Sequence, residues 1–327
     1  MGRWHFEVAR SLGARIVAIV DSDQKAAQLL GRRAPHARLL SQSASLETHL
    51  AVEVAHVCTP AATHASIALD LLERGISALV EKPLADDAAT TRRILETAQR
   101  TGAQICPVHQ YAFQDAIERA RAALANLGTV HRIEFNICSA GASDGVMTPA
   151  NLISEILPHP ISILQRFFPD MPVNHLAWSI LNANPGEFLA SSQYRETLIS
   201  IYISANARPT RMTTQLQCAS GSIEIDGYHG YAIVLPGAVS RAAKISAPFS
   251  RSLGHLTAAA KNLAGRSLRG EAAYPGLKEL TRQFYESVAR KDRSLAPISI
   301  DAILAGAEAR DDMRREPPLG RQADVAP

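Results

Sequence analysis

The sequence predicts two domains: a parallel α/β sheet, followed by an α+β domain whose sheet is mainly antiparallel and open. As far as residue 110, short apolar runs alternate with helical patterns, which is typical of βαβ units. Beyond Gln114, candidate strands follow one another with few helices between them, which is typical of antiparallel sheets. A chain of 327 residues is long enough for two cores. We therefore expect domains at 1–114 and 115–327.

The elements of the first domain are assigned from their hydrophobic period and from the residues that end them. Five apolar residues precede Asp21, and a similar apolar run leads into Thr59-Pro60. Such runs are typical of strands buried in a parallel sheet. The expected strands are 15–20, 37–40, 52–58, 78–80 and 104–108, and the expected helices are 6–12, 24–31, 63–74 and 87–100.

The second domain has a different rhythm. Residues 130–138 alternate between apolar and polar side chains, which indicates a strand with one face exposed. Several further strands follow before the chain returns to helices. The expected strands are 130–138, 176–181, 198–204, 211–218, 222–226 and 232–235, and the expected helices are 116–125, 152–168, 277–290 and 301–314.

Composition excludes several classes of function. The net charge of +3 is too small to indicate a nucleic-acid partner. The four cysteines stand far apart without metal-ligand spacing, so we expect no metal site. There is no signal-peptide pattern, and no apolar run approaches the ~18 residues of a membrane span. We expect a cytoplasmic protein that binds neither nucleic acid nor membrane.

The opening residues resemble the middle of a dinucleotide-binding motif. Such a fold begins with a strand and a glycine-rich turn, then a helix whose N-terminus holds the pyrophosphate. Here a helical pattern starts almost at once, and Asp21 falls ~20 residues after the expected turn. Gly2 would then be the last glycine of the motif. We expect a Rossmann-like sheet whose first strand and glycine loop are missing, so that its neighbouring strands lack a partner.

Asp21 has two interpretations. Its carboxylate could accept hydrogen bonds from the adenosine ribose, which would favour NAD over NADP. It could equally be a turn residue in Asp21-Ser22-Asp23 that caps the next helix.

Two loops fall at the C-terminal ends of expected parallel strands, where ligands bind in open α/β sheets. They contain Thr59-Pro60 and Glu81-Lys82-Pro83. A partly buried Lys82 would have a lowered pKa and could hydrogen-bond a reacting hydroxyl. The alternative is a surface ion pair at a strand end.

His159 precedes a proline that suits the first turn of a helix, so we expect His159 at the N-cap of a helix over 160–168. The positive end of that helix would favour a neutral imidazole, which accepts a proton near pH 7. The alternative is a loop histidine with one backbone hydrogen bond.

Together these residues resemble the glucose–fructose oxidoreductase / inositol dehydrogenase / MocA (Gfo/Idh/MocA) family. Its Glu-Lys-Pro motif stands here as Glu81-Lys82-Pro83, after Thr59-Pro60 and His64. Gly2-Arg3-Trp4-His5 resembles the stretch just past that family's glycine loop, and Gly128-Thr129-Val130 resembles the turn into its second domain. The resemblance is strongest over residues 2–168.

The resemblance implies an NAD(P)-dependent oxidoreductase that transfers hydride between nicotinamide and a hydroxyl of a sugar, polyol or nucleotide sugar. Lys82 would contact the substrate hydroxyl, and His159 would be the acid/base. NAD is expected more than NADP, and the protein would form a homodimer or homotetramer through the open face of the second sheet. The residues expected at the cofactor are Gly2, Arg3, Trp4, Asp21, Thr59, Pro60, His64, Glu81 and Lys82.

The family motif departs from this sequence around His159. Glu155 and Ser162 stand where the family has aspartates, four residues before and three after the histidine. Glu155 could still orient the imidazole, whereas Ser162 cannot supply a charge. The segment His109-Gln110-Tyr111 is expected near the substrate together with Glu155. Because the phosphate loop is missing, the alternative hypothesis is a non-catalytic relative that acts as a binding or regulatory protein.

Overall fold

The computed structural model describes residues 1–46, 50–139, 154–181, 186–237, 240–271 and 273–315, which form two compact units. Unit 1 comprises Met1–His109 and Leu277–Leu304, and unit 2 comprises Gln110–Gly276 and the residues from Ala305 onward. The order of elements in the sequence assigns 115–327 to one domain, whereas the structure returns Leu277–Leu304 to unit 1. The physical reason is the apolar face of helix α9, which packs against α1 and β4.

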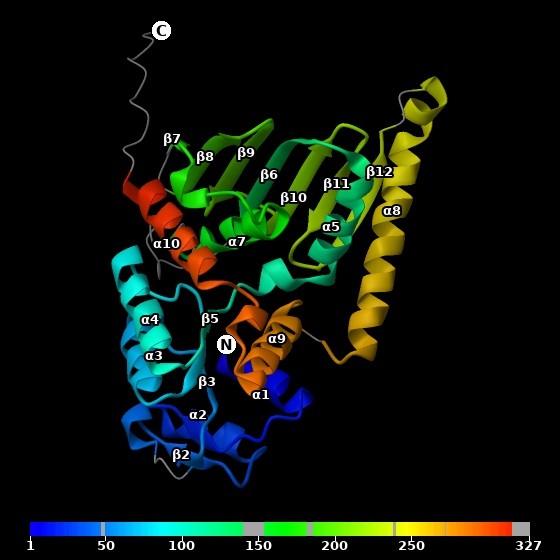
Figure 1. Cartoon of the computed structure of the whole chain (residues 1–327). Helices are drawn as coiled ribbons and strands as arrows, with labels where there is room; N and C mark the ends of the chain where they lie inside the picture. Colours follow the sequence, from blue (N-terminus) through cyan, green and yellow to red (C-terminus); the bar gives the residue numbers. More distant parts are fainter. Residues whose placement is uncertain (47–49, 140–153, 182–185, 238–239, 272, 316–327) are drawn as a thin grey trace. The chain divides into compact units, whose positions relative to one another are not determined.

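The elements of unit 1 alternate between strands and helices along the chain (Figure 1). They are α1 (Gly2–Ser11), β1 (Ala18–Val20), α2 (Gln24–Gly31), β2 (Arg38–Leu40), β3 (Val54–Val57), α3 (His64–Glu73), β4 (Ser77–Val80), α4 (Ala88–Thr101), β5 (Ile105–Pro107) and α9 (Leu277–Arg290). Helix α10 (Ile300–Arg315) begins in unit 1 and ends in unit 2.

The parallel strands of unit 1 form two separate sheets. Strands β1 and β2 pair with each other, and β3, β4 and β5 form a second sheet in that order. Within the described residues, β1 and β3 therefore each pair on one side only. The core is divided in the same way, since Phe6, Ile19 and Ala27 form a small cluster apart from the main cluster around β4.

Local sequence signals fix where helices α2 and α4 begin and where α4 ends. The Asp23 carboxylate caps α2 by accepting hydrogen bonds from two backbone amides, and the Asp87 carboxylate caps α4 by accepting one from Thr90 N. Gly102 ends α4 in the left-handed conformation that glycine adopts without strain. Strand β4 is buried along its whole length, as expected for a central strand of a parallel sheet.

Unit 2 is built on one seven-stranded sheet with the order β12-β11-β10-β6-β9-β8-β7. All neighbours are antiparallel except the pair β6 and β9. The strands are β6 (Val130–Cys138), β7 (Ser179–Leu181), β8 (Glu187–Tyr194), β9 (Thr197–Ser204), β10 (Arg211–Cys218), β11 (Gly221–Asp226) and β12 (Tyr231–Pro236). The helices are η4 (Gln110–Phe113), α5 (Asp115–Leu127), α7 (Pro158–Phe167) and α8 (Arg241–Leu268).

The two faces of this sheet differ in chemistry. Along β6, Ile133, Phe135 and Ile137 are buried, while the alternate residues Glu134 and Asn136 are half-buried. Figure 1 shows α5 and α7 on one face of the sheet. The two-residue alternation therefore places an apolar layer under the helices and leaves a polar open face. The predicted fold class, a Rossmann-like parallel sheet and a mainly antiparallel open sheet, is confirmed.

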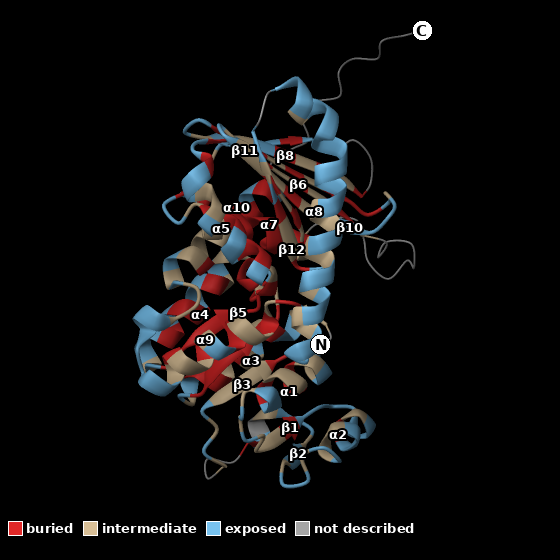
Figure 2. Cartoon of the chain, turned by 90° about the vertical axis from the view of Figure 1, so that its right-hand side faces the viewer, coloured by how far each residue is buried: buried red, intermediate tan, exposed pale blue. Residues whose placement is uncertain are grey.

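Helix α8 is exposed along its length, as the pale blue of Figure 2 shows, and contains no buried residue. Ile245, Phe249, Leu253, Leu256 and Leu263 share one side of the helix and are between 60% and 78% exposed. We call these five residues the α8 stripe. The other side is anchored to the sheet, for example by His255, whose Nε2 lies 3.1 Å from Glu224 Oε2. Even so, no helix in the described part of the chain has the length and apolar character that crossing a membrane requires.

Candidate active site

The N-terminus of α1 lies against the C-terminal end of β3. A Cβ added to Gly2 would be 3.9 Å from Cys58 Cβ, the residue that directly follows β3. No side chain caps the first turn of α1, so its backbone amides point outward from the helix without a side-chain acceptor. Arg3 is exposed and its guanidinium carbon lies 5.3 Å from the centre of the Trp4 ring. This turn has the character of an anion-binding helix terminus.

Asp21 directly follows β1 and is exposed. Its Oδ1 accepts a hydrogen bond from Asp23 N at 2.9 Å, and Asp23 rather than Asp21 caps α2. Asp21 therefore does not cap α2. Its side chain shapes the turn, and its carboxylate group stays at the surface at the end of β1. That position is compatible with binding a ribose hydroxyl.

His64 joins the two loops that follow β3 and β4. Its Nδ1 lies 2.7 Å from the carbonyl oxygen of Pro83, and its Nε2 lies 2.8 Å from that of Thr59. The side chain is buried. Its contacts favour a positioning role for the predicted cofactor residue, because both ring nitrogens already face backbone carbonyls.

Thr59 and Pro60, which precede this histidine, are exposed. They therefore remain candidates for direct contact with a cofactor.

The Glu81-Lys82-Pro83 motif begins where β4 ends. Glu81 is buried, Lys82 is half-buried, and the Lys82–Pro83 peptide bond is cis. Glu81 Oε2 accepts a hydrogen bond from Lys82 N at 3.3 Å, and its Oε1 lies 2.9 Å from His5 Nε2. The carboxylate is therefore held inside the unit, and Lys82 is the member of the motif placed nearer the surface.

Three residues around Glu81 were not predicted as functional. His5 comes from α1, His56 from β3 and Tyr285 from α9, and they continue the hydrogen-bonded chain that starts at Glu81. A histidine inside the apolar run Val54-Ala55-His56-Val57 was a signal, because a buried polar side chain requires a partner. Nothing in the sequence points to Tyr285, which reaches this place only through the return of α9.

In unit 2, His159 is buried in the first turn of α7. The prediction that it caps a helix beginning at Pro160 is wrong, because α7 begins at Pro158, whose fixed φ suits that first position. The Tyr111 ring meets the His159 ring edge-on at 4.6 Å, and Tyr228 lies 6.4 Å from Tyr111. Burial, and to a smaller extent the phenols of Tyr228 and Tyr274, raise the pKa of Tyr111. This phenol therefore stays protonated.

Ser162 and Glu155 occupy the two positions where the family motif has aspartates. Ser162 Oγ donates to the carbonyl oxygen of His159 at 2.8 Å, so it supports the backbone of the turn rather than the imidazole. Glu155 is half-buried in a helical turn just before α7.

The remaining predicted substrate residues straddle the boundary between the units. His109 is half-buried and belongs to unit 1, whereas Gln110 and Tyr111 begin unit 2 in η4.

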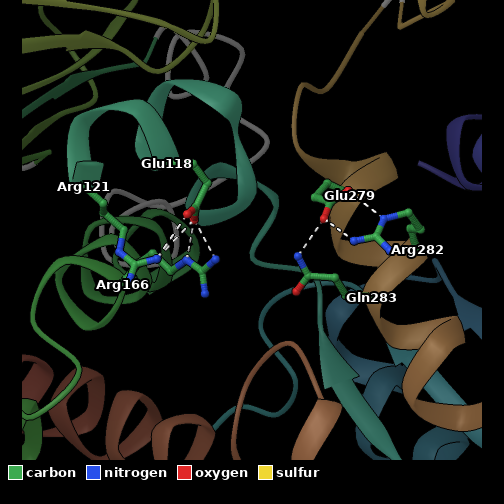
Figure 3. A network of polar contacts seen from close by, with 6 residues as sticks. All are labelled: Glu118, Arg121, Arg166, Glu279, Arg282 and Gln283. Carbon is green, nitrogen blue, oxygen red and sulfur yellow. Dashed lines mark hydrogen bonds and ion pairs between the residues drawn. The ribbon is translucent and has the colours of Figure 1, made fainter. Parts of the chain in front are cut away.

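Arginine–glutamate contacts fix the helices that present these residues (Figure 3). In unit 2, Arg166 of α7 donates to Glu118 of α5 at 2.9 and 2.6 Å, and its guanidinium carbon lies 5.0 Å from the Phe113 ring centre. These contacts hold the helix that carries His159.

In unit 1, a network within α9 links Glu279 to Arg282 and Gln283. It lies on the same helix as Tyr285.

The structure thus brings together two groups of predicted residues, each within its own unit. Gly2, Thr59, His64, Glu81 and Lys82 gather at the ends of β3 and β4. His159 contacts Tyr111 in unit 2, whereas Lys82 belongs to unit 1. In the described residues, no cluster of histidine, cysteine, aspartate or glutamate has the arrangement of a metal site.

The first group fits a dinucleotide. The first turn of α1, which no side chain caps, lies beside the end of β3 and supplies donors for phosphate. The surface carboxylate at the end of β1 supplies an acceptor for ribose, and the lysine at the end of β4 supplies a donor for a polar ring substituent. This combination defines a Rossmann-type nucleotide-binding domain joined to an open-sheet domain.

Comparison with known proteins finds a family that the N-terminal third of the chain resembles. Residues 1–109 match the model of the Gfo/Idh/MocA family, described as "Oxidoreductase family, NAD-binding Rossmann fold". The matched residues make up a third of this chain, and over them the chain is similar to the Gfo/Idh/MocA oxidoreductases. An inositol 2-dehydrogenase from Rubrobacter xylanophilus is 33% identical over 104 residues, which are 32% of this chain and 29% of the relative. The match thus spans less than a third of that relative's length.

Solved structures share the fold over nearly the whole chain. A UDP-N-acetylglucosamine 3-dehydrogenase from Acidithiobacillus ferrooxidans superposes with a TM-score of 0.71 at 14% identity, covering 96% of this chain and 93% of that one. An oxidoreductase from Agrobacterium radiobacter, solved with NAD+, L-tartaric acid and magnesium, gives 0.68 at 13% identity over 94% and 91%. At such identities the likeness concerns the fold alone.

Proposed function

We propose that the protein is a nicotinamide-dependent oxidoreductase that acts on a hydroxyl of a sugar, a polyol or a nucleotide sugar. The observation that carries this proposal is the position of Lys82, at the end of β4, in a unit that resembles an NAD-binding oxidoreductase family. The relatives support the substrate class, because their names include an inositol dehydrogenase and a nucleotide-sugar dehydrogenase.

The cofactor residues follow from the first group. The amides of Gly2 and Arg3 face the pyrophosphate beside Trp4, whose own amide donates to the Met1 carbonyl oxygen, and Asp21 accepts from the ribose hydroxyls. A carboxylate there repels a 2′-phosphate, so NAD is preferred over NADP. Thr59 and Pro60 line the cofactor from the loop after β3. When bound, the nicotinamide supplies the hydride acceptor or donor.

Proton transfer is the task of the chain's own residues. Lys82 donates a hydrogen bond to the substrate oxygen and stabilises the negative charge that develops there. His159 acts as acid/base in the same step, with Tyr111 packed against its ring. His109, Gln110 and Glu155 complete the proposed substrate contacts.

A panel assay tests the function. Purified protein is mixed with polyols, aldoses or nucleotide sugars in the presence of NAD or NADP. Nicotinamide reduction is followed by the absorbance of the reduced ring at 340 nm. We expect turnover with at least one class and a clear preference for NAD. An Asp21→Ala variant should lose most of that preference, since the carboxylate that repels the 2′-phosphate is gone. Saturable NADH binding without turnover on any substrate would instead favour a non-catalytic binding protein.

The proposal extends to assembly as a homodimer or homotetramer. Two surfaces of unit 2 support a second copy as the partner: the polar open face of the sheet and the α8 stripe. The stripe is uncharged, and α8 contains no acidic residue, so an identical stripe is a better match than an anionic or cationic one. Arg251, the basic residue in the middle of α8, is paired with Glu224 on the sheet side.

The oligomeric state separates the two surfaces. We expect light scattering after size exclusion to give a multiple of the chain mass for the wild type. Leu256→Glu places a charge within the α8 stripe and should lower the mass to that of one chain if the stripe is the interface. Leu198→Glu does the same on the open face of the sheet, where Leu198 is exposed. A wild type of single-chain mass would contradict the proposal.

A further inference from the structure

A chain of four titratable side chains runs through unit 1 from the end of β4 to α9. Glu81 Oε1 lies 2.9 Å from His5 Nε2, and His5 Nδ1 lies 2.8 Å from His56 Nδ1. The opposite nitrogen of the second ring, His56 Nε2, lies 2.8 Å from the Tyr285 hydroxyl. Glu81 and His5 are buried, whereas His56 and Tyr285 are half-buried. The chain therefore has an inner end at Glu81 and an outer end at Tyr285.

The protons of this chain are constrained by its chemistry. An ionised carboxylate only accepts, so His5 Nε2 donates to Glu81. Burial disfavours the charged form of His56, and the neighbouring His5 adds to this effect, so the pKa of His56 falls to about 3. His56 is consequently neutral near pH 7 and carries a single ring proton, on one nitrogen or on the other.

Two arrangements satisfy every hydrogen bond. In the first, His56 Nδ1–H donates to His5 Nδ1, and His56 Nε2 accepts the proton of the Tyr285 hydroxyl. In the second, His5 Nδ1–H donates to His56 Nδ1, and His56 Nε2–H donates to the Tyr285 oxygen. The second arrangement contains one more proton, which makes His5 an imidazolium paired with the Glu81 carboxylate.

The arrangements interconvert without movement of heavy atoms. Tyr285 hands its hydroxyl proton to His56 Nε2 and takes a proton from solvent, while His56 hands its Nδ1 proton to His5. Each step breaks one N–H or O–H bond and forms another across a hydrogen bond that is already present. The sum is the uptake of one solvent proton, which comes to rest beside Glu81.

We propose that His5, His56 and Tyr285 form a proton relay that connects the Glu81 carboxylate with solvent at α9. Its use rests on the proposed function, because oxidation of an alcohol gives a hydride to the nicotinamide and releases the hydroxyl proton. In that direction the steps run in reverse: His5 returns a proton to His56, His56 returns one to Tyr285, and Tyr285 releases one to solvent. Glu81 directly precedes the proposed substrate lysine. The relay residues do not touch the reacting atoms and are positioning residues.

Other titratable groups close to the inner end are the N-terminal amine, Lys82 and Cys58, of which Cys58 does not compete with this route. Cys58 follows β3, and burial together with the negative charge of Glu81 raises its pKa to about 12. Its thiol therefore keeps its proton over the range in which imidazoles titrate. The Tyr285 hydroxyl, whose pKa is raised to about 12 by burial, likewise passes a proton on without remaining ionised.

Exchange of the His5 ring N–H with water tests the relay. It is measured by nuclear magnetic resonance on cofactor-free protein labelled with 15N-histidine. Tyr285→Phe removes only the phenol oxygen, and we expect exchange to slow by at least ~10-fold because the route from solvent is interrupted. A merely structural hydrogen bond gives the opposite result, since its loss loosens the unit and leaves exchange unchanged or faster. Either of those outcomes overturns the relay.

Two further measurements sharpen the test. Tyr194→Phe, which removes the hydroxyl of a half-buried tyrosine on β8 in unit 2, should leave the exchange rate unchanged. In the wild type, the His56 proton should move from Nδ1 to Nε2 as His5 is protonated, and a tautomer that stays fixed throughout rules the relay out. The exchange measurement needs neither cofactor nor substrate. A protein that oxidises no alcohol would therefore refute the proposed function, and the test of the relay would still be valid.

Discussion

Replacing Lys82 with methionine is expected to lower kcat steeply while the protein stays folded. Methionine keeps the length and the apolar stem of the side chain but removes the ammonium group, so the developing charge on the substrate oxygen loses its donor. Contributions of this kind are about 10²–10⁴-fold in rate, and we expect kcat to fall within that range. Because Lys82 is half-buried at a strand end, little core packing is lost. Steady-state kinetics and circular dichroism measure the two effects.

A matched control is Lys25→Met on α2, where the lysine is exposed and belongs to neither group of site residues. It removes the same charge from unit 1 and should leave kcat unchanged. A Lys82→Met enzyme with nearly normal kcat would remove Lys82 from the mechanism. A variant that is inactive because it has unfolded would be recognised by its spectrum.

Gly276→Ala is expected to cause the largest loss of stability. Gly276 has φ +91°, a conformation that side chains rarely adopt, and an added Cβ would overlap the carbonyl oxygen of Gln110 and lie 3.0 Å from Phe113 C. Backbone strain and overpacking each cost about 1–3 kcal/mol, so we expect the free energy of unfolding to fall by about 3–5 kcal/mol. Because the clash falls on η4, which carries Gln110 and Tyr111, the variant should also raise KM.

Gly270→Ala provides the control for backbone strain. Gly270 has φ +67°, but an added Cβ would meet nothing within 4 Å. Strain without overlap should cost about 1–2 kcal/mol. Urea unfolding followed by the fluorescence of Trp178, which is buried in unit 2, measures both in a Trp4→Phe background. Equal losses in the two variants would contradict the predicted overlap at Gly276.

Most regular elements could be predicted because their signals are local. Residues 24–31, 130–138, 211–218 and 277–290 form helices or strands with the predicted bounds. Strand β8 was missed because Ser191-Ser192-Gln193 breaks the apolar alternation, and its pairing with β9 is what makes it a strand. Helix α8 was missed because Pro248 and several serines weaken its pattern and because no face of it is buried.

The site was predicted in part for the same reason. The strand-end positions of Lys82, Asp21 and Thr59 could be predicted from the apolar runs that precede them, while their roles at a cofactor or substrate stay predictions. The helix that carries His159 begins at Pro158 rather than at Pro160. Both prolines suit the first turn of a helix, and the sequence offers no choice between them. His64 was found as a family residue, yet its two carbonyl contacts show it holding loops together.

By itself, the sequence determined most helices and strands apart from β8 and α8, the polar and apolar faces of the second sheet, and the strand-end position of Lys82. These depend on residues close together in the chain. Only the tertiary structure decided that Leu277–Leu304 joins unit 1 and that Glu81, His5, His56 and Tyr285 form one hydrogen-bonded chain. The bonded pair His56 and Tyr285 alone is 229 residues apart, and a periodic pattern carries no record of which distant faces will pack together.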